Sequence, residues 1–326
     1  MYLKGDTMSD YRILVTGATG QIGSELTVTL REKYGKDNVI AMGHRRKPSK
    51  TLEESGPYIT GDVRDRENLE KIIREYDIDT VYHMAAILSA TGENNPQLCW
   101  DVNVNGLYNL LEIAREKRIG IFCPSSIAVF GPSTPKENTP QDTILTPTTM
   151  YGITKVVGEL LGEYYVQKYG VDVRGVRYPG IISSETPPGG GTTDYAVEMF
   201  YYAVKGEKYT CFVREDTVLP MMYMPDCLKA TIQLMEADFS RLKHHTNFNV
   251  SGMSFSAKEL EEEIRKYRPD FECEYKPDFR QKIAETWPRT IDDSCARQEW
   301  GWKPDYDLEK MVKDMLERLE KRLSRE

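Results

Sequence analysis

The N-terminal half of the chain alternates short apolar, β-branched runs with segments of helical periodicity, and this alternation limits the possible folds most strongly. The apolar runs are RILVT at 12–16, NVIAM at 38–42, DTVYHMA at 79–85 and IGIFCPSS at 119–126. Strands that alternate with helices form crossover units, and these build a parallel sheet covered by helices on both faces. We therefore predict an α/β fold with a doubly wound, Rossmann-type parallel sheet.

Helical periodicity is clearest in two segments of this half. Their apolar residues recur every three or four positions and should face the core: Leu69, Ile72, Ile73 and Tyr76 in one, and Leu107, Leu110, Leu111 and Ala114 in the other. The helices expected near 94–117 and 150–169 are unusually long and apolar. They favour a homodimer formed by helix packing, with burial within one chain as the alternative.

The regular alternation weakens after about residue 180, and the length of 326 residues suits roughly two domains. We predict a dinucleotide-binding Rossmann domain over 1–180. The rest, 181–326, is predicted to be mainly a smaller C-terminal α/β cap that binds the substrate, with some segments returning to the first domain. Charged helices are expected at 256–268 and 307–325, and the apolar stripe of the last one should pack onto the protein.

Composition excludes several classes of function. The chain has 43 basic and 51 acidic side chains and a net charge of −8, which argues against a general nucleic-acid binder. Its six cysteines form no CxxC pair and its four histidines form no HExxH motif, so we predict no metal site. Without a long apolar run or a secretory signal, we expect a soluble cytoplasmic protein with no membrane partner, or a mitochondrial-matrix protein in a eukaryote. The first ten residues are polar, and Met8 is an alternative start.

A glycine-rich turn follows the first predicted strand. In TGATGQIG the glycines are Gly17, Gly20 and Gly23, and a helix begins at about Gln21 and Ile22. Such glycines let backbone N–H groups approach a pyrophosphate, which the helix N-terminus also attracts. Because the strand and helix flank the motif as required, we predict dinucleotide binding by these five residues rather than a flexible loop.

The end of the second strand bears on the choice of cofactor. An NAD site usually has an Asp or Glu there, but no carboxylate occurs from Val39 through Thr51. Gly43 is followed instead by His44, Arg45 and two further cations, which suit the 2′-phosphate of NADP. A solvated basic loop is the alternative.

Other strand ends supply further candidate cofactor residues. Asp62, followed by Val63, is placed to accept a bond from the adenine amino group, although Asp beside Gly is also common in turns. The small Ala85 and Ala86 would let the cofactor pass closely. His83, just before them, is expected to be a structural histidine.

The segment YGITK contains the catalytic candidates Tyr151 and Lys155. A YxxxK spacing on a helix puts the phenol and the ammonium on one face, where the ammonium stabilises the phenolate and lowers its pKa. Such a tyrosine can act as a general base. Ser126 follows an apolar strand 25 residues upstream, where a hydroxyl can hold the substrate oxygen. A surface Tyr–Lys pair and a turn-forming serine are the alternatives.

Taken together, TGATGQIG, NVNG at 103–106, SSIAVFG and YGITK resemble the extended short-chain dehydrogenase/reductase superfamily. Within it, the chain is similar to the short-chain L-threonine 3-dehydrogenases. This closer likeness is carried by RYPGIIS at 177–183, GGGTTDYAVEMFYYA at 189–203, LPMMYMPD at 219–226 and the stretch 283–302. It covers the chain from Tyr11 to the last helix.

The resemblance implies NAD-dependent oxidation of the β-hydroxyl of L-threonine to 2-amino-3-ketobutyrate, in threonine catabolism towards glycine or aminoacetone. It makes Tyr151 the base, Lys155 its pKa modulator and ribose ligand, and Ser126 the residue that orients the hydroxyl. It adds Asn103, Tyr178 and Pro179 to the cofactor residues. It also implies a set of substrate residues: Ser89, Ser125, Ser126, Tyr151, Gly180, Thr192, Thr193, Asp194 and Trp287.

Two of these implications meet competing interpretations. Asp194 suits an α-ammonium group, and it also suits the N-terminus of the helix that TTD opens. Gly43 stands where the family ordinarily has an acidic residue, so NADP competes with the NAD that the resemblance implies.

Two other functions remain as alternatives for the whole chain. One is a nucleotide-sugar epimerase or dehydratase, because the same fold and the same Ser, Tyr and Lys serve that chemistry. The other is a non-catalytic, dinucleotide-sensing protein.

Overall fold

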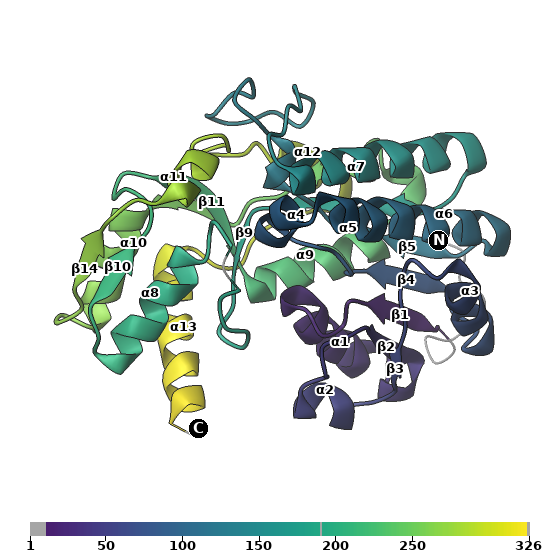
Figure 1. Ribbon diagram of the computed structural model, residues 1–326, viewed down its shortest axis with the longest axis horizontal. Helices are drawn as coiled ribbons and strands as arrows, with labels where there is room; N and C mark the ends of the chain where they lie inside the picture. The colour runs from purple at the N-terminus through teal and green to yellow at the C-terminus, as the bar shows by residue number, and fades with distance from the viewer. Residues whose placement is uncertain (1–10, 190, 325–326) are drawn as a thin grey trace. The chain divides into compact units, whose positions relative to one another are not determined.

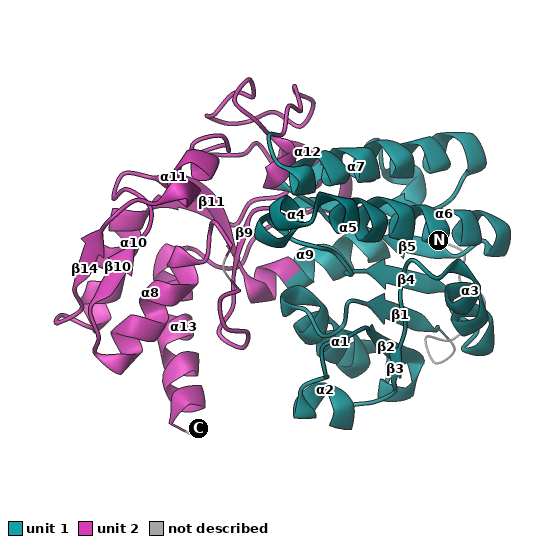
Figure 2. Cartoon of the chain, in the orientation of Figure 1, with its two compact units in different colours: residues 1–126, 148–177, 228–248 teal, residues 127–147, 178–227, 249–326 magenta. Residues whose placement is uncertain are grey.

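The computed structural model describes residues 11–189 and 191–324, so the polar leader and the alternative start at Met8 lie outside the described residues. The chain divides into two compact units, each assembled from three stretches (Figure 2). Unit 1 comprises residues 1–126, 148–177 and 228–248. Unit 2 comprises residues 127–147, 178–227 and 249–326.

Unit 1 is built on a six-stranded sheet in which every pair of neighbours is parallel (Figure 1). The strand order is β3-β2-β1-β4-β5-β7. The strands are β1 (Ile13–Thr16), β2 (Val39–Gly43), β3 (Tyr58–Thr60), β4 (Thr80–His83), β5 (Gly120–Phe122) and β7 (Val173–Arg174). The predicted doubly wound fold is confirmed. Its order reverses between β1 and β4, and folds of this type bind ligands at the carboxyl ends of the strands beside that reversal.

The helices of unit 1 bury the apolar stripes that the sequence predicts. They are α1 (Gln21–Tyr34), α2 (Lys50–Glu54), α3 (Arg66–Glu75), α4 (Ser89–Asn94), α5 (Pro96–Trp100), α6 (Gly106–Lys117) and α7 (Met150–Tyr169). The stripes of α3 and α6 join the core of the sheet, where Leu69 and Leu107 are at most 1% exposed. Between α5 and α6 the helix passes through a π-helical turn, Asp101–Asn105.

Arg174 ties the late stretch 228–248 into unit 1. This stretch includes most of α9 (Met224–Glu236). The fully buried Arg174 side chain donates to the carbonyls of Leu234 and Ala237 at 2.7 Å each, and it pairs with Asp172. These contacts satisfy a buried cation that would otherwise be costly.

Unit 2 has its own small sheets and helices. Strands β9 (Gly180–Ile182) and β13 (Met253–Ser256) flank β11 (Val218–Tyr223), and β10 (Tyr209–Cys211) pairs with β14 (Cys273–Tyr275). The helices are α8 (Tyr195–Lys205), α10 (Ala257–Tyr267), α11 (Phe279–Ala284), α12 (Ser294–Trp300) and α13 (Leu308–Leu323). Helices α8, α10 and α13 contact one another, and the predicted stripe of α13 is buried at Met311, Val312, Met315 and Leu319. Unit 2 thus combines strands and helices, in line with the predicted α/β fold class, and its role as a substrate-binding cap stays a prediction.

Residues 127–147 belong to unit 2, whereas a boundary at residue 180 would leave them with the Rossmann sheet. Asn249 holds them through both its main chain and its side chain. Its backbone N–H donates to Gln141 Oε1 at 2.8 Å, and its Nδ2 donates to the carbonyls of Thr139 and Asp292. The bonds to Gln141 and Thr139 join positions more than a hundred residues apart, which no local pattern indicates.

The run IGIFCPSS forms two short strands rather than one. Strand β5 ends at Phe122, and Ser125–Ser126 form β6, which joins a separate sheet with β8 (Val176–Tyr178) and β12 (Phe248–Asn249) in the order β12-β8-β6. Pro124, which has no N–H to donate, lies between the two. No helix in the described part of the chain is long and apolar enough to cross a membrane.

Candidate functional site

The glycine turn joins β1 to α1 at the switch point of the unit 1 sheet. Gly17 has a positive φ of 64°, and a Cβ there would lie 2.5 Å from the backbone nitrogen of Ala85. A Cβ on Gly23 would lie 2.3 Å from the Gly17 carbonyl oxygen, so this glycine lets α1 begin close to the strand. Helix α1 starts at Gln21 and Ile22, where unbonded N–H groups favour an anion. The turn therefore fits a dinucleotide pyrophosphate.

His83 and Ala85 lie at the end of the neighbouring strand β4. The imidazole is 3% exposed, and its Nδ1 shares a hydrogen bond of 2.9 Å with Thr16 Oγ1, which also accepts the Ala85 N–H. Burial, with a smaller effect of the nearby Lys155 charge, lowers the pKa of His83 to about 3. The ring is neutral at physiological pH and fixes the end of β4. Ala85 and Ala86 follow it and are half-buried.

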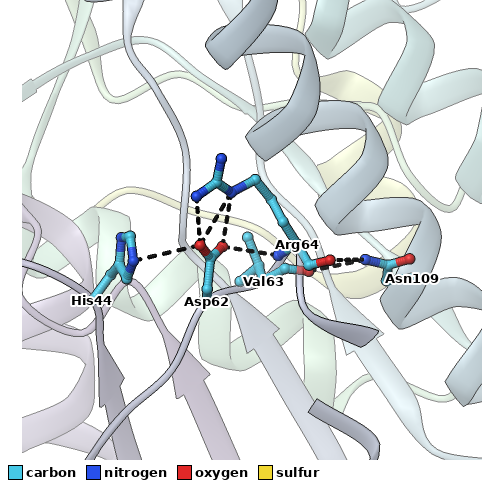
Figure 3. A network of polar contacts seen from close by, with 5 residues as sticks. All are labelled: His44, Asp62, Val63, Arg64 and Asn109. Atoms are coloured by element: carbon cyan, nitrogen blue, oxygen red, sulfur yellow. Dashed lines mark hydrogen bonds and ion pairs between the residues drawn. The ribbon is translucent and has the colours of Figure 1, made fainter. Parts of the chain in front are cut away.

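Asp62 lies in a small polar network just after β3 (Figure 3). Arg64 donates to both carboxylate oxygens through its guanidinium and to Oδ1 through its backbone N–H, and His44 Nε2 is 3.4 Å from Oδ2. The hydrogen bonds from Arg64 lower the pKa of Asp62 to about 2. The Val63 and Arg64 carbonyls are held by Asn109 Nδ2 at 3.2 Å each. Both carboxylate oxygens of Asp62 thus have protein partners, in addition to the turn that the sequence suggests for this residue.

Gly43, the last residue of β2, has no room for a side chain. A Cβ there would lie 2.1 Å from the Tyr58 hydroxyl and 3.0 Å from Thr19 Cγ2. The two cofactor candidates that follow it, His44 and Arg45, are exposed. The phenol of Tyr58, a residue not predicted from the sequence to lie at this site, therefore occupies the place of the missing carboxylate.

Tyr151 and Lys155 lie in the first two turns of α7, and both are half-buried. The Lys155 ammonium is 5.5 Å from the centre of the Tyr151 ring and donates to the Pro124 carbonyl at 2.7 Å. Helix α7 contacts strand β6, which contains the half-buried Ser126. The three predicted catalytic residues thus lie on adjoining elements of unit 1.

Two contacts fix the start of α7 against neighbouring helices. Glu93 of α4 accepts the Met150 N–H at 2.7 Å, and this short helix begins at Ser89, a predicted substrate residue. Asn103, in the π-helical turn, uses its side-chain amide on both backbone groups of Ile87 and on Thr154 Oγ1. Asn103 therefore joins the segment at Ile87 to the start of α7, and the cofactor role that the resemblance implies stays a prediction.

A buried ion pair joins Glu159 of α7 to Arg177 of β8. Glu159 accepts from Nε and Nη2 of Arg177 at 2.9 and 2.8 Å, and their side chains are 4% and 2% exposed. The hydroxyl of Ser125, predicted to bind substrate, donates to the same carboxylate. Glu159 and Arg177 are not among the functional residues predicted from the sequence. The available signal is the spacing of four residues from Tyr151 to Lys155 and again to Glu159.

Unit 2 holds the other residues that the resemblance assigns to the substrate. Gly180 begins β9, and a Cβ there would meet Met221 Sδ at 2.3 Å and Thr193 Cγ2 at 2.8 Å. Thr192 is 4% exposed, and Thr193 is half-buried. The segment before α8 therefore packs closely on β9. The remaining cofactor candidates, Tyr178 and Pro179, are buried just before β9.

Asp194 precedes α8 and closes the glycine segment. Its Oδ2 accepts the N–H groups of Gly189 and Gly191 at 2.7 and 2.8 Å, while its side chain does not cap the helix. Asp194 thus stands at the N-terminus of α8, as the sequence suggests, and its carboxylate accepts from the loop rather than from the helix backbone. Trp287 is 8% exposed and lines a cavity of about 100 Å³ with Lys136, Thr217 and Gln281.

Comparisons with known proteins extend over almost the whole chain. A family model described as "NAD dependent epimerase/dehydratase family" matches residues 13–251. An uncharacterised epimerase/dehydratase of Staphylococcus aureus is 51% identical over 312 residues, covering 95% of this chain and 97% of that protein.

Solved structures give the same extent of likeness. The L-threonine dehydrogenase of Phytophthora infestans is 54% identical with a TM-score of 0.91, covering 95% of this chain and 99% of that one. The L-threonine dehydrogenase of Clostridium difficile is 52% identical with a TM-score of 0.94, covering 96% and 98%. A monomeric L-threonine 3-dehydrogenase from a metagenome is 54% identical with a TM-score of 0.91, covering 95% and 99%.

Proposed function

This chain belongs to the NAD dependent epimerase/dehydratase family, and we propose that it is an L-threonine 3-dehydrogenase. It would oxidise the β-hydroxyl of L-threonine to give 2-amino-3-ketobutyrate. The observation that carries the proposal is the extent of the likeness. The dehydrogenase of Phytophthora infestans is similar at 54% identity over 95% of the chain, so the likeness includes unit 2 as well as the Rossmann unit that many enzymes share.

Two predictions made from the sequence are confirmed. The family match and the structural neighbours bear out the resemblance to the short-chain L-threonine 3-dehydrogenases. They also identify the chain as an enzyme of the nicotinamide-dependent dehydrogenase class. The substrate and the individual roles of the residues are what we propose.

Unit 1 has the features needed to hold the cofactor. The turn at Gly17–Gly23 would bind the pyrophosphate, and Ala85 and Ala86 would let the dinucleotide pass over the end of β4. When bound, the nicotinamide ring supplies the acceptor for the hydride that leaves Cβ of threonine. The resemblance implies NAD, whereas the residues after β2 favour NADP.

Tyr151 would remove the proton of the β-hydroxyl. Its ring lies beside the Lys155 ammonium, which is 5.5 Å from the ring centre. Lys155 is itself positioned by the Pro124 carbonyl, next to the strand of Ser126. Ser126 would hold the β-hydroxyl oxygen of the substrate while the proton of that hydroxyl moves to the Tyr151 oxygen. Loss of hydride from Cβ then leaves a neutral ketone.

Unit 2 would select the amino acid. A carboxylate such as Asp194 suits an α-ammonium group, and hydroxyls such as those of Thr192 and Thr193 suit an α-carboxylate. Gly180 would contribute by letting Thr193 pack closely on β9. Ser89 and Trp287 complete the proposed set. Ser125 is less suited to it, because its hydroxyl donates to Glu159.

Steady-state assay of the full chain with L-threonine tests the proposal. We expect formation of reduced cofactor with L-threonine. An epimerase would not give this result, because its reaction involves no net reduction of the cofactor. Tyr151→Phe should lower kcat by about 100-fold or more, the usual contribution of a general base. Tyr202→Phe, at a tyrosine with 37% exposure in unit 2, should leave kcat unchanged. Full activity of Tyr151→Phe would contradict the role of Tyr151, and inactivity of the native chain towards threonine would contradict the reaction.

Asp194 needs variants that separate its two roles. Asp194→Asn keeps an oxygen that can accept the N–H groups of Gly189 and Gly191 but removes the negative charge, whereas Asp194→Ala removes both. If the carboxylate binds the ammonium group, both variants should raise KM for L-threonine by about tenfold or more, the scale of a charged hydrogen bond. If only Asp194→Ala raises KM, the residue serves the loop alone.

The homodimer also remains a proposal, as does the cytoplasmic location. The exposed apolar side chains on α6 and α7 support the dimer. They include Tyr108, Ile153, Leu160 and Tyr164, each more than 40% exposed.

A further inference from the structure

The end of strand β2 cannot hold the acidic side chain that recognises an unmodified ribose. In a Rossmann unit, an Asp or Glu at this position accepts a hydrogen bond from the 2′-hydroxyl of NAD. Here the residue is Gly43, and the Tyr58 hydroxyl lies 2.1 Å from where its Cβ would be. A carboxylate at position 43 would have to displace the Tyr58 ring. The absence of acid is therefore built into the packing of β2 against β3, which pair in parallel from Ala41 to Gly43.

The turn after Gly43 carries exposed positive charges that are not paired with other groups in the described part of the protein. His44, Arg45, Arg46 and Lys47 are all exposed. Within the described ranges 11–189 and 191–324, Arg45, Arg46 and Lys47 have no hydrogen bond or ion pair. Consecutive cations repel one another, and an arrangement of this kind favours an anion bound between them.

The carboxylate of Asp62, beside this turn, does not neutralise the positive charges of the turn. Asp62 accepts two side-chain hydrogen bonds from Arg64 at 3.0 and 2.6 Å, and this pair is nearly neutral as a whole (Figure 3). His44 lies 3.4 Å from the same carboxylate and is thereby held at the start of the turn. The excess charge of Arg45 and Arg46 therefore remains available to a ligand.

We infer that the turn Gly43–Lys47 binds the 2′-phosphate of NADP(H), and that the protein prefers NADP(H) to NAD(H). A phosphate monoester carries more than one negative charge, and the planar guanidinium groups of Arg45 and Arg46 match its oxygens. With Gly43 at the end of β2, no carboxylate there would repel the phosphate, and the Tyr58 phenol fills the space instead. The inference deepens the proposed function by naming the cofactor, and it rests only on dinucleotide binding by unit 1.

Binding measurements on the full chain, freed of bound nucleotide and without threonine, test the inference directly. Titration by ligand fluorescence should give a Kd for NADPH at least about tenfold below that for NADH, the scale of one charge-assisted hydrogen bond. Adenosine 2′,5′-bisphosphate should compete with NADPH more strongly than 5′-AMP does. Equal or tighter binding of NADH would overturn the inference.

Charge-removing variants locate the site. Arg45→Ala and Arg46→Ala should together weaken NADPH binding by about tenfold or more and leave NADH binding within about twofold. Lys36→Ala is the matched control, because Lys36 is exposed just before the amino end of β2 and should affect neither ligand. Equal weakening of NADPH and NADH by the arginine variants would overturn the assignment of these residues to the 2′-phosphate, as would no weakening at all.

A variant designed to reverse the cofactor preference tests whether weaker NADPH binding could result from loss of folding. Gly43→Asp combined with Tyr58→Ala opens space for a carboxylate and should shift preference towards NADH, with a gain in NADH affinity that a misfolded protein cannot show. No gain in a variant with native thermal unfolding would count against the role of Gly43. The two proposals fail separately: tight NADPH binding without threonine oxidation contradicts only the reaction, and NADH-preferring threonine oxidation contradicts only the cofactor.

Discussion

His83 shows how one residue links the fold of unit 1 to acid stability. The ring is almost fully buried at the end of β4, hydrogen-bonded to Thr16, and the positive charge of Lys155 acts on it. Its pKa of about 3 lies below the ordinary value of 6.5. The folded protein thus keeps His83 neutral at a pH where the unfolded chain binds a proton.

This difference predicts a loss of stability in mild acid. Because the folded pKa is lowered, the contribution of His83 is complete above about pH 6.5 and declines as the pH falls towards 3. Between pH 7 and pH 5 the free energy of unfolding should fall by about 2 kcal/mol from this group alone. Denaturant titrations of the native chain and of His83→Asn should show that the variant lacks this part of the loss. Equal losses in both proteins would contradict the prediction.

Single residues also show what the sequence can and cannot reveal. The glycines of TGATGQIG were predicted to lie between a strand and a helix, and they do, because a strand, a tight turn and a helix N-terminus are all local features. The partner of Gly43 was not predictable. Tyr58 reaches it from the next strand, and no local signal shows that its hydroxyl takes the space of a carboxylate.

Helix α7 places three functional groups in successive turns. Tyr151, Lys155 and Glu159 recur every four residues, so a phenol, an ammonium and a buried carboxylate follow one another along the helix. The two groups proposed for catalysis are half-buried, whereas Glu159 is buried with Arg177. The ion pair fixes the helix to β8, and the Pro124 carbonyl fixes Lys155.

The Glu159–Arg177 pair should therefore be important for stability. Glu159→Gln leaves a buried guanidinium without its counter-charge, and we expect the free energy of unfolding to fall by about 3–5 kcal/mol. Glu54→Gln is the matched control, because its ion pair with Lys50 is exposed and should be worth less than about 1 kcal/mol. Denaturant unfolding of both variants gives the comparison. Similar small losses would contradict the prediction.

Among the secondary structure elements, periodicity predicted those with a continuous local pattern. The apolar stripes of α3, α6 and α13 are buried as expected. The π-helical turn at Asp101–Asn105 has no such pattern, because one extra residue in a turn changes the hydrogen bonding and leaves the composition ordinary. The predicted run IGIFCPSS likewise joins β5 and β6, since only tertiary pairing assigns these two short strands to different sheets.

At the scale of the whole molecule, the exposed face of α7 predicts self-association. Ile153, Leu160 and Tyr164 are 41%, 66% and 46% exposed and lie at spacings of seven and four residues on one side of the helix. We expect the native chain to sediment as a dimer and Leu160→Glu as a monomer, because a buried unpaired charge opposes association.

Phe279→Glu provides the control for this experiment. Phe279 is 69% exposed but belongs to unit 2, so the substitution should leave the dimer intact. A native chain that sediments as a monomer, as the metagenomic dehydrogenase is described, would contradict the prediction.

The sequence indicated a change of organisation near residue 180 but not how the units interleave. Each unit takes three stretches of chain, and the bonds that gather them join distant positions. Arg174 holds the carbonyls of Leu234 and Ala237, and Asn249 holds that of Thr139. Such pairings depend on tertiary contacts, which leave no periodic trace in the sequence.

This interleaving has a consequence for the chain as the ribosome makes it. Strands β1 to β5 are translated early, yet the carbonyls that satisfy the buried Arg174 are translated some sixty residues after it. The Rossmann unit therefore cannot complete its packing until residues up to 248 have left the exit tunnel, by which time much of unit 2 has also been made. For the same reason, exchanging unit 2 between relatives would require three separate grafts rather than one cassette.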